Sequence, residues 1–399
     1  MTVDKLKNLT LLITDGKHGD CENADNSGYY FVSCKDVHDG IIDYSDARQI
    51  TEQDFAETHR RTQLQPDDIL VTNSGTIGRM ALVKDAPETA RTTFQKSVAI
   101  VKPDTKKIIP AYLYYCLLNR VTDFVNNSNG SAQKNLLLGT MRDFSIQYYE
   151  EVEKQETVVS IIKPYDDLIE TNQRQIKLLE EAAQRVYKEW FIDLRFPGHE
   201  NVPMVDGVPE GWKKQRLNLV SKVLRRGISP MYNDDGNYTV ISQKCIRAAI
   251  MDIKESRRQE KDYLPELNLQ DGDTVICSTG TGTLGRVGQV FGEYPNTTFD
   301  SHVTLVRTKQ CPNYFYYAIK AQEEYLMGMG RGSTNQQELY RNVIEELEVF
   351  IPPENILNYA EITFAAFHEQ ITILKNEISS LSEARDRLLP KLMSGEIAV

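Results

Sequence analysis

The chain has 399 residues, of which 40% are hydrophobic and 26% charged, and its formal net charge is −11. This length allows two domains of ordinary size with connecting helices, and no apolar run approaches the ~18–20 residues of a membrane span. The six cysteines form no CxxC pair and no histidine lies at metal-ligand spacing. We therefore expect reduced thiols in a cytoplasmic protein, with no zinc site and no disulfide framework.

The negative charge is unevenly distributed along the chain. Residues 1–150 and 196–350 carry net charges of only −3 and −2, whereas the much shorter segments 151–195 and 351–399 carry −3 each. A local basic face for nucleic acid is compatible with this distribution, and scattered surface charge is the alternative. The candidate basic residues are Arg60, Arg61, Arg79, Arg91, Lys96, Lys102, Lys106 and Lys107, then Lys213, Lys214, Arg216, Lys222, Arg225, Arg226, Arg247, Lys254, Arg257 and Arg258.

The chain repeats itself after about 205 residues. The matching segments are 64–83 with 269–290, 95–101 with 300–306, and 130–136 with 332–339. A two-copy repeat predicts an internal pseudo-twofold axis. Duplex DNA is a suitable partner for such symmetry, because half-site spacing mirrors protein symmetry.

Each copy predicts the same series of elements in chain order. In the first copy, short β-branched segments at 68–75, 79–84 and 96–102 predict strands, and Pro110 opens a helix that extends to residue 127. The second copy predicts strands at 274–280, 286–291 and 302–307 and a helix at 313–326. Both domains are therefore expected to be α+β, with a small, strongly bent sheet.

Glycine-rich turns follow the first predicted strand of each copy. Residues 280–285 match GxGxxG, but a strand follows instead of a helix, so no helix N-terminus is available for a dinucleotide. Tight turns that need positive φ explain the glycines better. Arg79 and Arg286 end these turns, where they can reach a phosphate or a base edge. The chain shows no GxSxG, HExxH or GKS/T motif, which favours a binding protein over an enzyme.

Two segments with heptad spacing close the two copies. Their apolar positions are Ile162, Tyr165, Ile169, Ile176, Leu179, Ala183, Val186 and Trp190 in one, and Phe364, Phe367, Ile371, Leu374, Ile378, Leu381 and Leu388 in the other. This spacing predicts two long antiparallel helices paired as a coiled coil, with Asn172 setting the register. An ordinary amphipathic helix on a globular core is the alternative. We expect Pro164 and Pro390 to kink or stop these helices.

The length of these segments suggests a spacer. Residues 165–190 span roughly 39 Å as a helix, close to the ~34–36 Å of one DNA turn. Two recognition domains on such a spacer would reach the same face of DNA about one turn apart.

The polar loops at 130–135 and 332–337 have suitable chemistry for base edges. Gln133 and Asn335 can bond adenine through two hydrogen bonds, and Lys134 can reach guanine. An exposed polar loop without a ligand is the alternative interpretation.

In sequence, the chain resembles the specificity (S) subunit of type I restriction–modification enzymes over nearly its whole length. The resemblance rests on the paired SGTIGR and TGTLGR turns, the paired GSAQ and GSTN loops, and the segments NQRQIKLLEEAAQRVYKEWFIDLRFPG, GVPEGWKKQRL and EARDRLLPKLMSGEI. It implies target-recognition domains at 1–150 and 196–350, a central conserved helix or spacer at 151–195, and a C-terminal conserved helix at 351–399.

The resemblance also implies the partners. Each recognition domain would read one half of a bipartite, gapped sequence in double-stranded DNA. The helices would dock two modification subunits, which bind S-adenosylmethionine and methylate adenine, and restriction subunits that translocate and cleave DNA are a further possible partner. We expect no cofactor in this chain.

We therefore predict a non-catalytic DNA-recognition subunit. The candidate DNA contacts are Arg79, Lys96, Gln133, Lys134, Arg286, His302, Arg331 and Asn335. The candidate spacer and docking residues are Ile169, Asn172, Ile176, Leu179, Val186, Ile371, Leu374, Ile378, Leu381 and Leu388. A coiled-coil scaffold with duplicated protein-binding domains is the main alternative, and an autonomous methyltransferase is a third.

Overall fold

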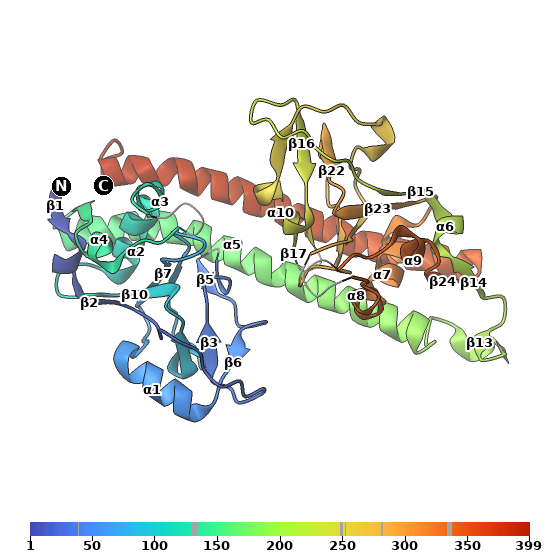
Figure 1. Ribbon diagram of the computed structural model, residues 1–399, viewed down its shortest axis with the longest axis horizontal. Helices are drawn as coiled ribbons and strands as arrows, with labels where there is room; N and C mark the ends of the chain where they lie inside the picture. Colours follow the sequence, from blue (N-terminus) through green and yellow to red (C-terminus); the bar gives the residue numbers. More distant parts are fainter. Residues whose placement is uncertain (39, 130–133, 248–249, 252, 281, 333–336) are drawn as a thin grey trace. The chain divides into compact units, whose positions relative to one another are not determined.

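The computed structural model describes residues 1–399 except 39, 130–133, 248–249, 252, 281 and 333–336. The chain divides into two compact units (Figure 1). The first unit comprises Met1–Glu170 and Ser379–Val399, and the second comprises Thr171–Ile378. Each unit contains the strands and loops of one copy of the sequence repeat, and the closing helix of each copy continues into the other unit.

A four-stranded antiparallel sheet forms the centre of the first unit. Its order is β2 (Thr10–Asp15), β10 (Val98–Pro103), β7 (Ile69–Thr72) and β8 (Met80–Leu82). The middle strands β7 and β10 are almost continuously apolar and buried, because helices or loops cover both faces of the sheet. These strands confirm the three predicted from the first copy and add β2.

The second unit repeats this arrangement. Its central strands run in the order β15 (Ser221–Arg226), β23 (Val303–Thr308), β20 (Thr274–Cys277) and β21 (Val287–Gln289), and β18 (Ile250–Met251) and β17 (Ile246–Arg247) extend the sheet. The register is repeated too, since Val98 pairs with Thr72 and Val303 pairs with Cys277. The expectation of two similar units of mixed helix and strand is therefore confirmed.

Smaller sheets also occur in both copies. The three-stranded sheet is β6 (Arg48–Gln49), β3 (Tyr30–Val32) and β9 (Thr92–Phe94) in the first unit. In the second it is β19 (Arg257–Gln259), β16 (Tyr238–Ile241) and β22 (Thr297–Phe299). A two-stranded sheet pairs β1 (Thr2–Lys5) with β11 (Ser145–Tyr148), and its counterpart pairs β14 (Lys213–Arg216) with β24 (Glu348–Ile351).

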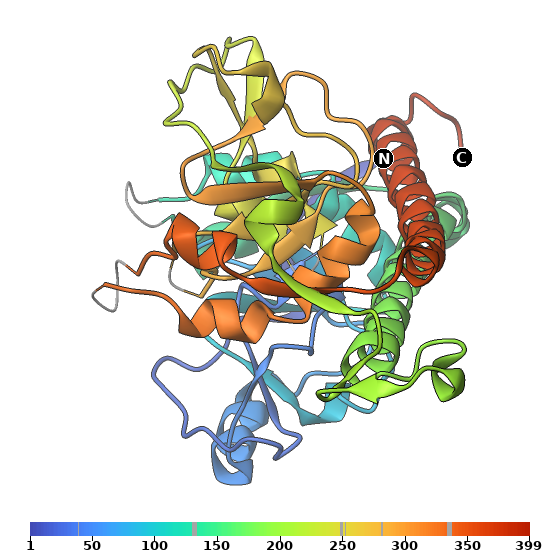
Figure 2. The ribbon, with the colours of Figure 1, turned by 90° about the vertical axis from the view of Figure 1, so that its right-hand side faces the viewer.

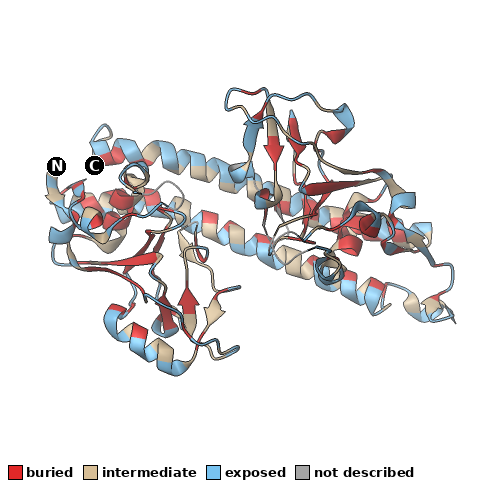
Figure 3. Ribbon diagram, viewed as in Figure 1, coloured by how far each residue is buried: buried red, intermediate tan, exposed pale blue. Residues whose placement is uncertain are grey.

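Helix α1 (Glu52–Thr62) distinguishes the two units. Thr51 caps its N-terminus by accepting a hydrogen bond from the Asp54 N–H. The helix lies at the end of its unit away from α2, and most of its residues are exposed (Figures 1 and 3). In the second unit the corresponding segment, residues 260–273, is fully described and contains only a 3₁₀ turn at Pro265–Leu267.

The helix predicted at 110–127 is interrupted. It forms α2 (Pro110–Leu118) and α3 (Val121–Asn126), and the second copy breaks at the same place into α7 (Pro312–Lys320) and α8 (Glu323–Gly328). The prediction of one continuous helix was therefore wrong in both copies. Short helices α4 (Leu138–Arg142) and α9 (Arg341–Glu345) follow in each unit, and α6 (Leu217–Val220) belongs to the second.

Two long helices carry the heptad segments. Helix α5 (Val152–Tyr187) begins ten residues before the predicted seam and ends in a π-helical turn at Lys188–Ile192, and α10 spans Glu354–Ser394. Pro164 and Pro390 lie inside these helices, so the expectation that they stop the helices was wrong. A proline removes one backbone donor. Buried side chains lie on both sides of each proline, Ile162 and Ile169 around Pro164 and Leu389 and Leu392 around Pro390, and their packing favours a continuous helix.

Within each unit, parts of α5 and α10 pack as antiparallel neighbours. In the first unit, Asp166 bonds Arg385 at 2.7 Å, while Ile162 shares a core cluster with Leu389 and Leu392. In the second unit, the Asn172 amide donates to Glu377 at 3.0 Å and Ile176 packs with Ile371. In the second unit this helix pair lies along one side of the strands (Figure 2).

Candidate nucleic-acid interface

The candidate site of each unit contains a glycine-containing hairpin turn between two strands of the central sheet. Between β7 and β8, Gly75 and Gly78 have φ of +82° and +86°. Between β20 and β21, Gly280 and Gly285 have φ of +104° and +78°. These angles favour glycine over any residue with a Cβ. The strand–turn–strand interpretation of both motifs is confirmed.

Three segments meet at this turn in the first unit. The Asn73 N–H donates to the Ser97 carbonyl at 3.0 Å, and the Leu136 N–H donates to the Asn73 carbonyl at 2.8 Å. The Gly75 N–H also donates to the Lys134 carbonyl at 3.3 Å. We call the described residues of 73–79, 95–97 and 129–136 the first loop cluster.

The second unit assembles its segments with equivalent bonds. The Ser278 N–H donates to the His302 carbonyl at 2.8 Å, and the Leu339 N–H donates to the Ser278 carbonyl at 2.8 Å. Arg331 and Glu338 exchange backbone bonds, as Asn129 and Asn135 do in the first unit. The described residues of 278–286, 300–302 and 331–339 form the second loop cluster. The repeat in sequence is therefore a repeat in backbone hydrogen bonding.

Four of the predicted DNA contacts are exposed at these clusters. Lys96 and Lys134 belong to the first loop cluster, and His302 and Arg331 to the second. The His302 ring is oriented by a hydrogen bond of 2.6 Å between its Nδ1 and the Thr279 hydroxyl. The predicted contacts Gln133 and Asn335 lie outside the described residues.

The two turn arginines are half-buried. The Arg286 guanidinium donates to the carbonyls of Ile246 and Gly282, both at 3.0 Å, so it stabilises the turn from within. The Arg79 N–H donates to the Thr72 hydroxyl at 2.9 Å, and its carbonyl accepts from the Thr72 N–H. The structure thus gives Arg286 a local bonding role that its place in the sequence did not indicate.

Many residues of the predicted basic patches pair with acids. These ion pairs are Arg61–Asp15, Lys102–Asp68, Lys107–Asp104, Lys214–Glu348, Arg225–Glu266 and Arg226–Glu338. A cation paired with an acid in this way contributes little net attraction for a distant phosphate, because the two charges largely cancel. The patches alone are therefore a weaker indicator of the DNA face than the loop clusters.

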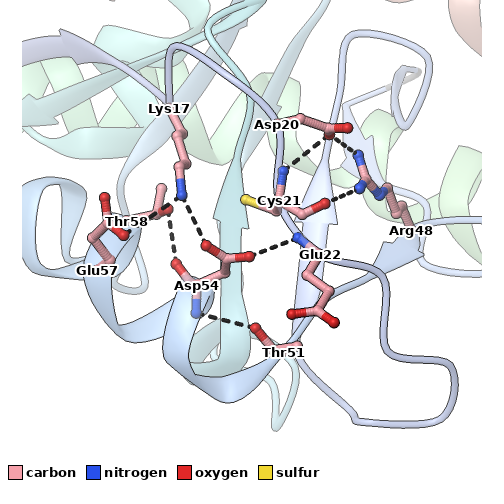
Figure 4. A network of polar contacts seen from close by, with 9 residues as sticks. All are labelled: Lys17, Asp20, Cys21, Glu22, Arg48, Thr51, Asp54, Glu57 and Thr58. Carbon is pink, nitrogen blue, oxygen red and sulfur yellow. Dashed lines mark hydrogen bonds and ion pairs between the residues drawn. The ribbon is translucent and has the colours of Figure 1, made fainter.

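A polar network supports the first loop cluster (Figure 4). The Lys17 ammonium donates to Asp54 of α1 at 2.9 Å, and the other Asp54 oxygen accepts from the Glu22 N–H at 2.6 Å. The carboxylate is thereby stabilised, and the bond to the Glu22 N–H and then the Lys17 ammonium hold the pKa of Asp54 below its usual value. The Lys17 carbonyl accepts from the Lys96 N–H at 3.0 Å, so the network links α1 to a predicted DNA contact.

Two glycines that the sequence analysis did not select bring the first strand close to the cluster. A Cβ on Gly16 would lie 1.9 Å from the Phe94 carbonyl oxygen, and one on Gly227 would lie 2.1 Å from that of Phe299. Both glycines follow the end of the equivalent strands β2 and β15. Their alignment with each other, 211 residues apart, was the only sequence signal that could have identified them.

The predicted spacer and docking residues are mostly covered by the chain itself. Ile169, Asn172, Ile176, Ile371 and Leu374 are buried, and the other five, Leu179, Val186, Ile378, Leu381 and Leu388, are half-buried. Ile176, Ile371 and Leu374 share a core cluster with Phe291, which follows β21. These three side chains therefore pack α5 and α10 against the second unit, and a partner would contact other faces of the helices.

The described residues show little catalytic chemistry. Burial raises the pKa of Cys277, next to the second loop cluster, to about 12, which disfavours a reactive thiolate. No group of three or more His, Cys, Asp or Glu side chains in the described part of the chain could hold a metal ion. None of its described helices is both long and apolar enough to cross a membrane.

Comparison with known proteins finds matches to both copies of the repeat. The family model for the type I restriction modification DNA specificity domain matches residues 13–181 and 209–382, which are the two copies of the repeat. The type I restriction enzyme MjaIX specificity subunit of Methanocaldococcus jannaschii is 26% identical over 370 residues, covering 88% of this chain and 82% of that protein.

Two further relatives agree. The type I restriction enzyme HindI specificity subunit of Haemophilus influenzae is 20% identical over 374 residues, covering 75% of this chain and 80% of its own length. The crystal structure of the type I restriction–modification system S subunit from M. genitalium aligns with a TM-score of 0.51 at 14% identity, covering 98% of this chain and 95% of that one. The solved structure supports the fold.

Proposed function

Because the chain belongs to the family of type I restriction–modification DNA specificity domains, whose members recognise DNA sequence and are non-catalytic, we propose that it reads a bipartite, gapped target. Each loop cluster would read one half-site. The observation that carries this proposal is the equivalence of the two clusters in backbone bonding together with their difference in side chains, Lys96 and Lys134 in one and His302 and Arg331 in the other. Equivalent frames with different side chains suit two different half-sites.

The candidate contacts divide between phosphate and base. Lys96 and Arg331 are exposed cations that can position the protein on the backbone, which contributes affinity without sequence preference. Gln133, Lys134 and Asn335 have side chains that can form hydrogen bonds with base edges. The His302 ring can donate or accept a hydrogen bond with a phosphate or with a base. The bond between His302 and Thr279 reduces the rotational freedom lost on binding.

The long helices would serve as spacer and docking surface. In this proposal α5 and α10 form an antiparallel coiled coil that sets the gap between half-sites. Two modification subunits would dock on its exposed faces and supply S-adenosylmethionine and the methyl transfer, and restriction subunits could join them. The antiparallel contacts Asp166–Arg385 and Asn172–Glu377 support the pairing of the helices.

The experiment is to purify this chain with the products of the adjacent genes and to map methylated adenine across the genome. We expect a complex containing a methyltransferase that marks a split motif with an unspecified gap. A stable complex that leaves no methylation motif, with no salt-dependent DNA affinity, would favour the scaffold alternative and contradict the proposal.

Substitutions in one cluster test the assignment of one half-site to each unit. Gln133→Ala should relax preference in one half-site only, and Asn335→Ala in the other, because each loop belongs to a different unit. Each lost base contact should reduce discrimination by about 1–3 kcal/mol. Equal relaxation of both halves by either variant would contradict the two-reader model.

A further inference from the structure

Arg226 lies where two segments of the second loop cluster meet. It is the last residue of β15, and its side chain is only 27% exposed. The guanidinium bonds the Glu338 carboxylate and donates to the carbonyls of Ser278 and Leu339, both at 3.3 Å. Ser278 precedes the glycine turn, whereas Glu338 and Leu339 end the polar loop. One planar cation therefore joins the turn to the end of the loop.

The effect of this contact extends to the predicted DNA contacts. Ser278 is bonded through its N–H to the His302 carbonyl, and Thr279 orients the His302 ring. Glu338 exchanges backbone bonds with Arg331 at 2.8 and 3.0 Å. The fixed fork of an arginine holds such a set of acceptors in one geometry, which a flexible lysine ammonium does not. Arg226 also neutralises Glu338, whose carboxylate would otherwise repel a nearby phosphate.

The first unit has the opposite charge at the equivalent position. In the strand pairing, Asp15 lies opposite Ala99 and Arg226 lies opposite Thr304. Thr304 is 205 residues after Ala99, so Asp15 and Arg226 occupy the same register position in the two sheets. Asp15 accepts from Arg61 of α1 at 2.8 Å and contacts His18 at 2.9 Å. Asp15 precedes Gly16 and Arg226 precedes Gly227. The residue at this position therefore bonds α1 in the first unit and the end of the polar loop in the second.

We propose that Arg226 is a positioning residue for the second half-site, which fixes the backbone of the second loop cluster in its reading conformation. This inference rests on the proposed DNA-reading function. It assigns the role to one unit only, because the equivalent Asp15 bonds different elements. A role in general stability would affect both half-sites or the amount of complex.

The test uses the complex with its modification subunits and a set of targets mutated in one half-site at a time. Arg226→Met, which keeps the length of the side chain but removes the fork, should lower discrimination at the second half-site about tenfold, a loss of ~1.4 kcal/mol. The first half-site should keep its preference. Arg226→Lys should give an intermediate loss. Arg225→Met is the matched control, because Arg225 is the adjacent residue and pairs with Glu266 at the surface at 2.7 Å.

The outcomes separate this inference from the proposed function. Unchanged discrimination in Arg226→Met, or equal loss at both half-sites, overturns the positioning role while the bipartite motif of the wild type stands. A wild-type complex that marks no bipartite motif overturns the proposed function itself. If Arg226→Met does not assemble, Arg226→Lys and Glu338→Gln decide the matter, since each keeps part of the bonding, and selective loss at the second half-site is again the expected result.

Discussion

Gly16 and Gly227 each lie so close to a neighbouring strand that we expect substitution by alanine to destabilise the protein strongly at these two positions. Alanine at either site would place a Cβ about 2 Å from a backbone carbonyl oxygen, which cannot move without disturbing its strand. We expect a loss of about 3 kcal/mol in the free energy of unfolding of the unit that carries the change. Thermal and chemical denaturation followed by a probe in each unit would measure it.

Matched controls exist in the same units. Gly139 in α4 and Gly328 in α8 have open space at the Cβ position and no positive φ, so alanine there should be neutral or stabilising by up to ~1 kcal/mol. Equal effects of Gly16→Ala and Gly139→Ala would show that the approach of the strand does not govern stability.

Glu180 of α5 predicts a pH dependence within the second unit. One of its carboxylate oxygens is buried without a hydrogen-bond partner. Burial raises the pKa of Glu180 from 4.5 to about 7, against the opposing influence of Lys320 and Lys375. Between these pKa values the folded unit binds more protons than the unfolded chain, so stability falls as the pH rises and is lowest above about 7.

The variant Glu180→Gln should remove this loss. At pH 8 it should be more stable than the wild type by about 2 kcal/mol, and at pH 5 the two should be nearly equal. Denaturation midpoints across this range would show the difference. Glu181→Gln, on the next residue and beside Arg185 at 3.9 Å, is the control and should keep the wild-type pH profile.

At the scale of elements, a half-buried ion pair joins α5 to α10 in the first unit. Asp166 accepts from Arg385 at 2.7 Å and from the Tyr115 hydroxyl of α2 at 2.8 Å, so three helices share one carboxylate. Asp166→Ala would leave the Arg385 cation, only 20% exposed, with the exposed Asp386 at 2.8 Å as its remaining ion-pair partner, and would leave the Tyr115 hydroxyl without this acceptor. We expect a loss of about 2 kcal/mol, because polar groups that are partly buried lose their shared acceptor.

Hydrogen exchange in α2, α5 and the end of α10 would register this loss as faster exchange in all three helices. The exposed pair Arg387–Glu383 lies on the same stretch of α10, and Glu383→Ala should cost at most about 0.5 kcal/mol. Similar exchange rates in the two variants would contradict a structural role for Asp166.

The sequence predicted the twin elements because both copies keep the same turns and strands. The glycine turns at 75–78 and 280–285 and the strands around them could be predicted because glycine and β-branched residues encode them locally. The central helix was expected within 151–195 but with a kink or stop at Pro164, whereas α5 continues from Val152 to Tyr187 because packing maintains the helix through the proline. Propensity is a weak signal where tertiary contacts decide.

The candidate site was predictable only in part, because some of its contacts join segments that are far apart in the sequence. Lys96, Lys134, His302 and Arg331 could be selected because they belong to repeated motifs, and the structure places them at the loop clusters. Arg226 was selected only as one of many basic residues, and its contact with the polar loop could not be predicted, because its partner Glu338 is 112 residues away and the equivalent residue of the first copy has the opposite charge. Contacts between distant segments leave no periodic pattern in one sequence.

At the scale of the whole molecule, the two helices that belong to both units predict how the DNA target should change. If α5 and α10 set the gap between half-sites, a seven-residue insertion in each, after Glu170 and after Ile378, keeps the heptad seam and lengthens both helices by about 10 Å. At about 3.4 Å per base pair, the gap should grow by about three base pairs.

The half-sites themselves should stay the same, because the loop clusters are untouched, and adenine methylation mapping would report both features at once. An insertion in α5 alone is the informative control. Because α10 keeps its length, the contacts Asp166–Arg385 and Asn172–Glu377 can no longer both form, and methylation should fall at every site. A gap that stays the same after the paired insertion would mean that the spacing is set by the recognition units or the docked partners, and that the helices act only as a scaffold.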